Sequence, residues 1–214
     1  MEENKTIKNM RLNYEKGQLL ESNVDKNPFI QFKLWFDEVT KSGVVEPNAM
    51  AIATATKIGI PSVRMVLLKG FDDSGFTFFT NYASRKGREI EDNPLAALLF
   101  WWGKLERQIR IEGKIVKVSR ESSIEYYNSR PIKSRLGALA SNQSEVIRNR
   151  QVLVDRFNEL EKKYKDNPPM PEKWGGYKLV PHKFEFWQGR NDRLHDRLVF
   201  EKNVNDWTLS RLSP

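Results

Sequence analysis

Residues 49–82, which read AMAIATATKIGIPSVRMVLLKGFDDSGFTFFTNY, decide the fold class of this chain. Two turn sequences, Ile58–Pro61 and Asp72–Gly75, divide the stretch into short runs rich in β-branched and aromatic residues. Runs of this length bounded by Gly, Pro and Asp are typical of strands joined by hairpin turns. The stretch therefore predicts three strands, which span Ala49–Thr56, Ser62–Lys69 and Phe76–Tyr82.

The sequence on both sides of this stretch mixes helical and strand patterns. Asn27-Pro28 begins a helix with an apolar stripe, and Gly43 ends it. An irregular alternation around Gly113 indicates a β-bulge. Short strands with hairpin turns between helices predict an α+β fold, an antiparallel barrel surrounded by helices. The further helices are predicted over 84–92, 120–130 and 145–165, and the further strands over 95–102, 108–118, 176–180, 183–188, 197–201 and 207–212.

The composition of the chain limits its domain organisation and the classes of protein to which it can belong. Residues 1–26 are polar and predict a mobile N-terminal arm or lid, whereas residues 27–214 predict a single domain. The chain has no cysteine and two histidines, which excludes disulfides and Cys-based metal sites, and no ligand spacing supports another metal site. No apolar run is long enough to span a bilayer, and no secretory signal is present. We therefore expect a cytoplasmic protein with neither a metal nor a membrane partner.

The net charge of +8 fits nucleic acid, a membrane surface or anionic small molecules. The cationic residues occur in short clusters, which suit phosphate-bearing ligands at least as well as a nucleic-acid duplex. One cluster brackets a strand with Arg64 and Lys69, and a regular strand directs these two side chains to opposite faces. Another places Arg85 and Lys86 at a helix start, where free N–H groups favour an anion.

A third cluster consists of Tyr126, Arg130 and Ser134, which are spaced by four residues. On a continuous helix they share one face and converge on an anion, although Pro131 indicates a break in the helix. A solvated surface is the alternative interpretation of this cluster. The same holds for the bracketed strand, and ordinary capping is the alternative at the helix start.

A fourth cluster lies in Arg193-Leu194-His195-Asp196-Arg197. In an extended run Arg193, His195 and Arg197 share one face, where their mutual repulsion costs stability. A bound anion or an electron-rich ring offsets that cost. This segment is therefore the strongest candidate for a functional site.

The chain carries a series of motifs that resembles the pyridoxine/pyridoxamine 5'-phosphate oxidase family. In order they are RMVLLK, FFTNYASRKGREIEDNP, LERQIRIEG, YYNSRPIKS, SNQS, KWGGY, and EFWQG followed by RLHDR. The resemblance extends from Met10 to Pro214 and implies an FMN-binding split barrel, in a homodimer with FMN sites at the subunit interface. It also implies oxidation of pyridoxamine or pyridoxine 5'-phosphate to pyridoxal 5'-phosphate, with O2 reduced to hydrogen peroxide.

The resemblance also implies the roles of individual residues. Arg193 and His195 are implied to be catalytic, bracketing the pyridine ring over the flavin, and the segment around Arg11 and Tyr14 is implied to close over the site. The residues implied to hold the phosphorylated substrate are Arg11, Tyr14, Lys69, Tyr126, Arg130, Ser134, Arg193 and His195. The residues implied to hold FMN are Arg64, Met65, Val66, Leu67, Leu68, Lys69, Phe79, Thr80, Arg85, Lys86, Gln108, Gln143, Ser144, Trp187 and Arg197.

Other classes of function remain open alternatives. One is a split-barrel flavin reductase with a nicotinamide or deazaflavin donor, against which stand the RLHDR segment and the cluster of Tyr126, Arg130 and Ser134. Another is a protein that binds a flavin or a B6 phosphate without turnover. The last is a basic nucleic-acid-binding module, for which strongly salt-dependent DNA binding is expected.

Overall fold

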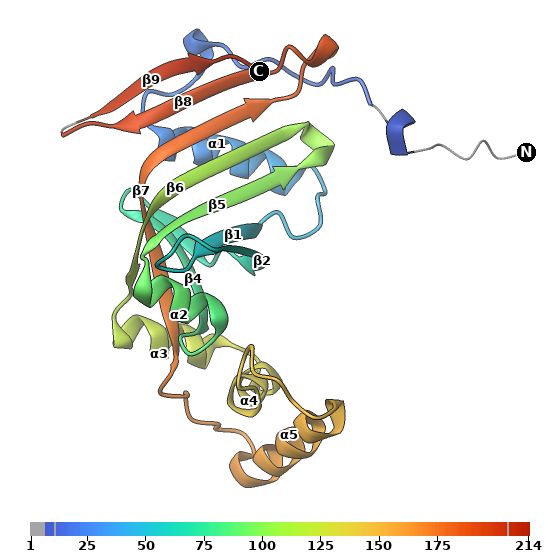
Figure 1. Cartoon of the computed structure of the whole chain (residues 1–214), viewed down its shortest axis with the longest axis vertical. Coiled ribbons are helices and arrows are strands. Elements are labelled where there is room, and N and C mark those ends of the chain that lie inside the picture. Colours follow the sequence, from blue (N-terminus) through green and yellow to red (C-terminus); the bar gives the residue numbers. More distant parts are fainter. Residues whose placement is uncertain (1–6, 11, 205) are drawn as a thin grey trace, which may run out of the picture. The chain divides into compact units, whose positions relative to one another are not determined.

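The computed structural model describes residues 7–10, 12–204 and 206–214 (Figure 1). Its strands are β1 (Ala49–Ala55), β2 (Pro61–Leu67), β3 (Gly70–Asp72), β4 (Gly75–Asn81), β5 (Leu95–Trp102), β6 (Arg107–Lys117), β7 (Trp174–Gln188), β8 (Asp196–Lys202) and β9 (Trp207–Leu212). Its α-helices are α1 (Pro28–Lys41), α2 (Arg85–Asp92), α3 (Arg120–Ser129), α4 (Ile132–Ala140) and α5 (Arg150–Tyr164). Short 3-10 helices span Ile7–Asn9, Glu21–Asn23, Gly103–Leu105 and Asn191–Arg193.

Neighbouring strands of the sheet follow the order β2-β1-β5-β6-β7-β4-β3, and β8 and β9 continue from β7. The pairs β1–β2, β3–β4, β4–β7, β7–β8 and β8–β9 are antiparallel. The predicted α+β class, an antiparallel sheet with surrounding helices, is therefore confirmed (Figure 1). None of the helices in the described ranges is both long and apolar enough to cross a membrane.

Residues 49–82 form the three predicted strands with one addition. β2 ends at Leu67 rather than at Lys69, and the short strand β3 pairs with the first residues of β4. A strand of three residues is too short to show an alternating pattern, so the sequence does not predict it. The earlier end of β2 matters for the functional site, because it frees Lys69 from the strand alternation.

β7 is one strand of 15 residues, where the sequence predicts two strands that flank Pro181. Proline lacks an N–H and is usually excluded from strand interiors, so its presence indicates a break. Here the chain before Pro181 pairs with β4 and the chain after it pairs with β8. Pairing on both sides of the proline keeps the segment extended.

The helices after Pro131 also differ from the prediction. α4 is not predicted by the sequence, and α5 begins at Arg150 rather than at Glu145. Asn149 caps α5, because its side chain accepts a hydrogen bond from the N–H of Val152 at 3.2 Å. This cap fixes the helix start at a polar residue that the apolar pattern alone does not mark.

The chain divides into two compact units. Unit 1 contains the described parts of residues 1–47, 99–111 and 183–214, and unit 2 contains residues 48–98 and 112–182. The core of unit 1 is rich in aromatic rings from α1 and the strands, comprising Phe32, Trp35, Phe100, Trp102, Phe184, Phe186 and Phe200. The core of unit 2 includes Met50, Ile52, Phe76, Phe78, Tyr127, Tyr177 and Leu179. The division into an arm over residues 1–26 and one domain over residues 27–214 stays a prediction.

The start of α1 matches its sequence signals. The Asn27 side chain accepts a hydrogen bond from the N–H of Phe29 at 2.9 Å, and Pro28 occupies the first helical position. The helix ends at Lys41, and Gly43 follows with a φ of 75°. The predicted helix between Asn27 and Gly43 is confirmed.

Gly113 lies in β6 without the phase change that indicates a bulge. Ile109, Ile111, Gly113 and Ile115 are buried in regular alternation. A Cβ atom on Gly113 would lie 2.3 Å from the carbonyl oxygen of Val180. The glycine is therefore required by the close approach of the two backbones.

We predict that Gly113→Ala lowers the free energy of unfolding by about 1–3 kcal/mol, because the added methyl group overlaps a backbone atom that cannot rotate away. Gly137→Ala is the matched control, since a Cβ atom there meets no atom within 4 Å inside α4. The control is expected to raise the free energy of unfolding by up to about 1 kcal/mol. Chemical denaturation of both variants measures these changes. Equal denaturation midpoints for the two variants would contradict the steric role of Gly113.

Candidate functional site

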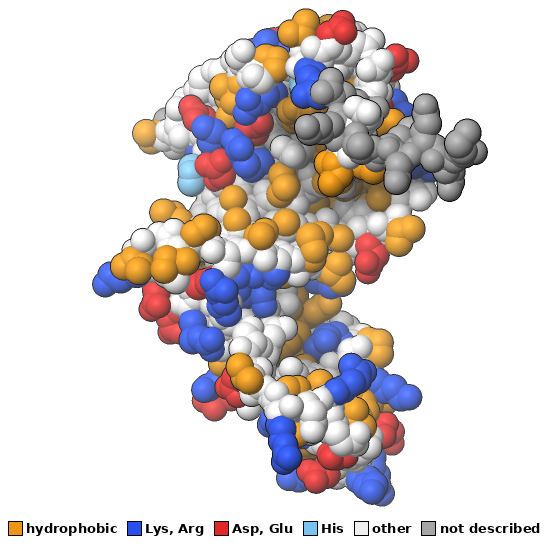
Figure 2. Space-filling model, turned by 45° about the vertical axis from the view of Figure 1, so that its right-hand side comes forward, with side chains coloured by type: hydrophobic (Ala, Val, Ile, Leu, Met, Phe, Trp, Pro, Cys, Tyr) orange, Lys and Arg blue, Asp and Glu red, His pale blue; other side chains and the backbone are white. Residues whose placement is uncertain are grey.

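The predicted site residues fall into two clusters, one in each compact unit. In unit 2 a cavity of about 1060 Å³ is lined by five cationic side chains, and no acidic side chain is among the described residues that line it. We call it the cationic cavity, defined by Arg64, Lys69, Arg85, Lys86 and Arg130. On the face shown in Figure 2, Lys and Arg side chains form several separate groups, in keeping with the short clusters in the sequence.

Arg64 and Lys69 line the same cavity, although strand alternation predicts opposite faces. That prediction is wrong because β2 ends at Leu67, two residues before Lys69. The N–H of Lys69 donates to the carbonyl oxygen of Thr77 at 2.8 Å, where the chain turns into β3. The turn therefore brings the two cations to one side.

Glu89 of α2 is the counter-ion of two of these cations. Its carboxylate pairs with Arg85 at 2.8 Å and with Arg64 at 3.3 Å. Burial by itself raises the pKa of Glu89, but neighbouring donors outweigh burial and lower that pKa to about 2. The neighbours that lower it are Ser62, Thr54, Arg85 and Arg64. Arg64 and Arg85 are therefore held in place by one buried anion.

Lys86 lies in the first turn of α2, whose N-cap is Ser84, and its side chain is buried with 7% exposure. Its Nζ donates to Oγ1 of Thr80 at 2.9 Å and to Oε1 of Gln143 at 3.0 Å. No carboxylate among the described residues pairs with it. Burial, and then the charge of Arg64, lower the pKa of Lys86 to about 8. A buried ammonium group at a helix start without a counter-ion is suited to bind an anion.

Tyr126, Arg130 and Ser134 also line the cationic cavity, but not from one continuous helix. Tyr126 lies on α3, Arg130 follows the end of α3, and Ser134 lies on α4 beyond Pro131. The break that Pro131 indicates is thus real, and the turn still brings the three side chains to the same cavity. Burial lowers the pKa of the Arg130 guanidinium, and its buried Nη1 has no hydrogen-bond partner.

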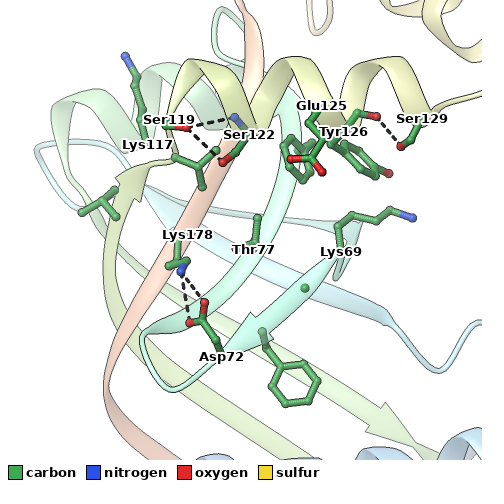
Figure 3. Close-up of a pocket in the computed structure, with 15 residues that line it drawn as sticks. Lys69, Asp72, Thr77, Lys117, Ser119, Ser122, Glu125, Tyr126, Ser129 and Lys178 are labelled. Atoms are coloured by element: carbon green, nitrogen blue, oxygen red, sulfur yellow. Dashed lines mark hydrogen bonds and ion pairs between the residues drawn. The ribbon is translucent and has the colours of Figure 1, made fainter.

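A neighbouring cavity of about 690 Å³ shares Phe79 with the cationic cavity, and it also shares Lys69 and Tyr126 (Figure 3). Figure 3 shows these two residues at one side and an ion pair of Lys178 with Asp72, 2.9 Å apart, at the other. Glu125 also lines this cavity. Its cations are therefore partly neutralised, and the cationic cavity is the better anion site.

The second cluster lies in unit 1 and forms an aromatic cavity of about 680 Å³. The His195 ring lies 4.7 Å from the Trp187 ring and 5.7 Å from the Tyr14 ring, measured between ring centroids. His195 Nδ1 accepts a hydrogen bond from the N–H of Arg190 at 3.1 Å. Burial, and then the charge of Arg193, lower the pKa of His195. Because Nδ1 accepts this hydrogen bond, the neutral ring carries its proton on Nε2.

Arg193 is not part of an extended run with His195 and Arg197. It ends a 3-10 turn and has a φ of 61°, next to Asp192 with a φ of 54°. Non-glycine residues with positive φ store strain and are often found at functional sites. Arg193 nevertheless lines the aromatic cavity together with His195. The predicted single-faced array of three is wrong, because β8 begins only at Asp196.

Arg197 lines none of these three cavities. Its Nε donates to the buried carboxylate of Glu185 at 2.9 Å, and its Nη1 donates to the carbonyl oxygen of Ser213 at 2.9 Å. Leu68 is buried and also lines none of them. Arg11 lies outside the described residues.

All the other predicted residues line one of the two principal cavities. Those in the cationic cavity are Arg64, Met65, Val66, Leu67, Lys69, Phe79, Thr80, Arg85, Lys86, Tyr126, Arg130, Ser134, Gln143 and Ser144. Those in the aromatic cavity are Tyr14, Gln108, Trp187, Arg193 and His195. No group of three or more metal-ligating side chains occurs in the described part of the chain.

Sequence reasoning missed several residues that line the cavities. Asn81, Ser141 and Trp174 line the cationic cavity, while Trp101 and Arg190 line the aromatic cavity. Trp101 precedes the buried Trp102 in β5, so strand alternation directs Trp101 outward, and its exposed fraction is 51%. An exposed tryptophan on a strand is a signal that sequence analysis can use.

Comparisons with known proteins identify what the chain is similar to. Residues 36–164 match the family model described as pyridoxamine 5'-phosphate oxidase. Residues 174–214 match the model described as the pyridoxine 5'-phosphate oxidase C-terminal dimerisation region. A pyridoxine/pyridoxamine 5'-phosphate oxidase from Nostoc sp. (strain PCC 7120) is 54% identical over 212 residues, which cover 98% of this chain and 99% of that relative.

Solved structures agree with this similarity. PhzG from Burkholderia lata 383, in complex with tetrahydrophenazine-1-carboxylic acid, matches with a TM-score of 0.88 and 32% identity, covering 94% of this chain and 100% of that one. A pyridoxamine 5'-phosphate oxidase-related, FMN-binding protein from Nostoc punctiforme matches with a TM-score of 0.69 and 17% identity, covering 87% and 98%. The second likeness concerns the fold alone, and it confirms the predicted split-barrel class.

We predict that Glu89→Gln lowers the free energy of unfolding at pH 7 by about 2 kcal/mol, because Arg64 and Arg85 lose their charged acceptor. A carboxyl group whose pKa is lowered on folding stabilises the fold above its unfolded pKa, and this stabilisation is lost as the pH falls toward the folded pKa. The wild type therefore loses the contribution of Glu89 between pH 4.5 and about 2, and the variant lacks that loss.

Denaturation midpoints measured from pH 7 to pH 2 test this expectation. The exposed Glu159→Gln on α5 is the matched control and is expected to leave the profile unchanged. Parallel pH profiles for the wild type and Glu89→Gln would rule out Glu89 as the buried counter-ion.

Proposed function

Because the chain belongs to the pyridoxine/pyridoxamine 5'-phosphate oxidase family, we propose that it oxidises pyridoxamine or pyridoxine 5'-phosphate to pyridoxal 5'-phosphate. The proposed cofactor is FMN, and the proposed electron acceptor is O2, which is reduced to hydrogen peroxide. When bound, FMN supplies a flavin ring that takes up two electrons from the substrate and returns them to oxygen.

One observation carries this proposal: the cationic cavity holds two separate groups of cations. Arg64, Arg85 and Lys86 lie around the start of α2, whereas Lys69 and Arg130 lie by α3. FMN and the proposed substrate each carry one phosphate, so the reaction needs two anion sites close together. Guanidinium and ammonium groups both bind phosphate oxygens.

The residues present fit a flavin phosphate at the start of α2. Lys86 is buried with hydrogen bonds to neutral oxygens only, so a phosphate supplies the negative charge it lacks. Thr80 and Ser144 line the same cavity and add hydroxyl groups. Met65, Val66 and Leu67 of β2 are also predicted FMN residues, and they line the same cavity. We propose that this group holds the phosphate and the ribityl chain.

The second group fits the phosphate of the substrate. Arg130 has a buried Nη1 without a partner, and Ser134 and Tyr126 contribute hydroxyl groups to the same cavity. Lys69 lies 6.0 Å from the centroid of the Tyr126 ring and adds a second positive charge. We propose that these four residues bind the phosphate ester.

His195 is better suited to orient the substrate than to remove a proton. Its Nδ1 already accepts a hydrogen bond from the backbone of Arg190, which leaves Nε2–H as a donor. A donor fixes the position of an oxygen or nitrogen atom on the pyridine ring, but it cannot act as a base. We propose that His195 and Arg193 hold the ring, and that Tyr14 of the arm closes over it.

The C-terminal dimerisation region supports a homodimer. We propose that the FMN sites lie at the subunit interface and that Gln108, Trp187 and Arg197 complete them. The present partner of Arg197 is Glu185, whose carboxylate also accepts a hydrogen bond from Arg110 at 2.6 Å. Arg197 is thereby held in a fixed position at the start of β8.

The proposal predicts a yellow protein that makes pyridoxal 5'-phosphate and hydrogen peroxide when pyridoxamine 5'-phosphate and air are supplied. Pyridoxamine without its phosphate is expected to react about a hundredfold less efficiently, because Lys69 and Arg130 then lack the phosphate ester that they bind. Absorbance of the product and a peroxidase-coupled assay measure the two products. A colourless protein that FMN cannot reconstitute, or oxidation of tetrahydrophenazine-1-carboxylic acid alone, would overturn the proposal.

A second prediction concerns the pH dependence of FMN binding. The protonated Lys86 binds the phosphate, and the pKa of Lys86 is about 8 in the free protein. The affinity for FMN is therefore expected to fall as the pH rises above about 8, by up to tenfold per pH unit. Lys86→Arg stays charged in this range and is expected to remove the fall.

Quenching of FMN fluorescence between pH 6.5 and pH 10 measures this dependence. Lys178→Arg is the matched control, because Lys178 already has Asp72 as its partner. The assignment of Lys86 fails if Lys86→Arg retains the wild-type profile.

A further inference from the structure

The motif Lys173-Trp174-Gly175-Gly176-Tyr177 lies at the start of β7, and its Trp174 lines the cationic cavity without a role in the proposed reaction. Its two glycines pair with residues of β4, Gly175 with Thr80 and Gly176 with Phe79. A Cβ atom on Gly176 would lie 2.7 Å from Cε1 of Phe79. The missing side chain therefore gives the Phe79 ring the space to lie across β7.

This space allows three aromatic rings to stack along one wall of the cationic cavity. The Phe79 and Tyr126 rings are 4.0 Å apart with an interplanar angle of 24°. The Phe79 and Trp174 rings are 5.6 Å apart with an interplanar angle of 14°. All three residues line the cavity, and Trp174 is 6% exposed. The stack fixes Trp174 as a rigid, nearly buried surface.

The guanidinium of Arg130 lies over the Trp174 ring, with Cζ 5.0 Å from the ring centroid. A π face attracts a guanidinium group without accepting its N–H donors in the plane, whereas a carboxylate occupies them. The buried Nη1 of Arg130 indeed has no hydrogen-bond partner. Trp174 thus holds the cation while leaving a donor available.

We propose that Trp174 is a positioning residue for the substrate phosphate, acting through Arg130. It holds the guanidinium over its ring, so that the N–H donors are oriented toward a phosphate ester before that ester binds. This inference rests on the proposed function, because it concerns the same substrate site. Trp174 acts on the phosphate through Arg130 and is not assigned a catalytic role.

Substitutions at Trp174 in the FMN-loaded enzyme test the proposal. Trp174→Leu removes the π face and is expected to raise the KM for pyridoxamine 5'-phosphate about tenfold. The Kd for unreactive 4-deoxypyridoxine 5'-phosphate is expected to rise by the same factor, whereas kcat is expected to change less than about twofold. Trp174→Phe retains a π face and is expected to stay within about threefold of the wild type. Steady-state kinetics and calorimetric titration measure these values.

A double-mutant cycle separates positioning from a general structural effect. In an Arg130→Met background the guanidinium is absent, so adding Trp174→Leu is expected to change the Kd less than about twofold. Trp35→Leu is the matched control, because Trp35 is 5% exposed and carries the guanidinium of Arg107 at 4.4 Å outside the cavities. The control is expected to lower stability without raising the Kd.

The proposal is overturned if Trp174→Leu leaves the Kd unchanged, if it raises the Kd equally in the Arg130→Met background, or if Trp35→Leu raises it as much. Trp174→Met replaces Trp174→Leu, with the same expected values, if the leucine variant does not fold. Measurements on the wild type test the proposed function separately. If the wild type binds the phosphate ester but does not oxidise pyridoxamine 5'-phosphate, the proposed oxidase activity is refuted and the comparison of Kd values remains valid. A wild type that does not bind the ester refutes both.

Discussion

The charge imbalance at the start of α2, where Arg64, Arg85 and Lys86 gather, is the constraint on which the rest of the cationic cavity depends. Lys86 and Glu89 lie one turn apart, and both side chains are buried. Glu89 is shared by Arg64 and Arg85, whereas Lys86 meets only neutral oxygen atoms. The Glu89 carboxylate thus holds two guanidinium groups in place, and the Lys86 ammonium group remains available to bind an anion. A second carboxylate beside Lys86 would neutralise the start of the helix and remove its preference for phosphate.

The sequence predicts the antiparallel sheet and most of its elements, because hairpin turns and strand alternation are local patterns. It fails where a short element shows no pattern, as in β3, and where tertiary pairing overrides a local signal, as at Pro181 in β7. The same limit applies to Gly113, whose role is the close approach of Val180 rather than a bulge. The errors at Pro181 and Gly113 share one cause: contacts between distant segments decide the local conformation.

In the candidate site, the sequence predicts which residues take part better than it predicts where their side chains lie. The five cations that line the cationic cavity are all among the residues predicted from the sequence, yet the sequence places Lys69 on the wrong face and Arg193 in a strand. Both errors follow from extrapolating a regular strand beyond its end, since β2 ends at Leu67 and β8 begins at Asp196. Trp174 was missed because its contact with Arg130 joins residues 44 positions apart in the chain.

What distinguishes a binding arginine from a structural one is the partner of its guanidinium group. Arg107 and Arg130 both lie over a tryptophan ring, but Arg107 also pairs with Glu38, while Arg130 keeps a buried nitrogen without a partner. An unpaired atom is not sufficient, because Nε of Arg135 also lacks a partner and Arg135 lines none of the cavities described. Arg130 differs from both, because it combines an unsatisfied donor with a place in the cationic cavity. Because a carboxylate partner can come from a distant part of the chain, as Glu38 does for Arg107, a sequence shows which cations are present and only the fold shows which of them remain available to a ligand.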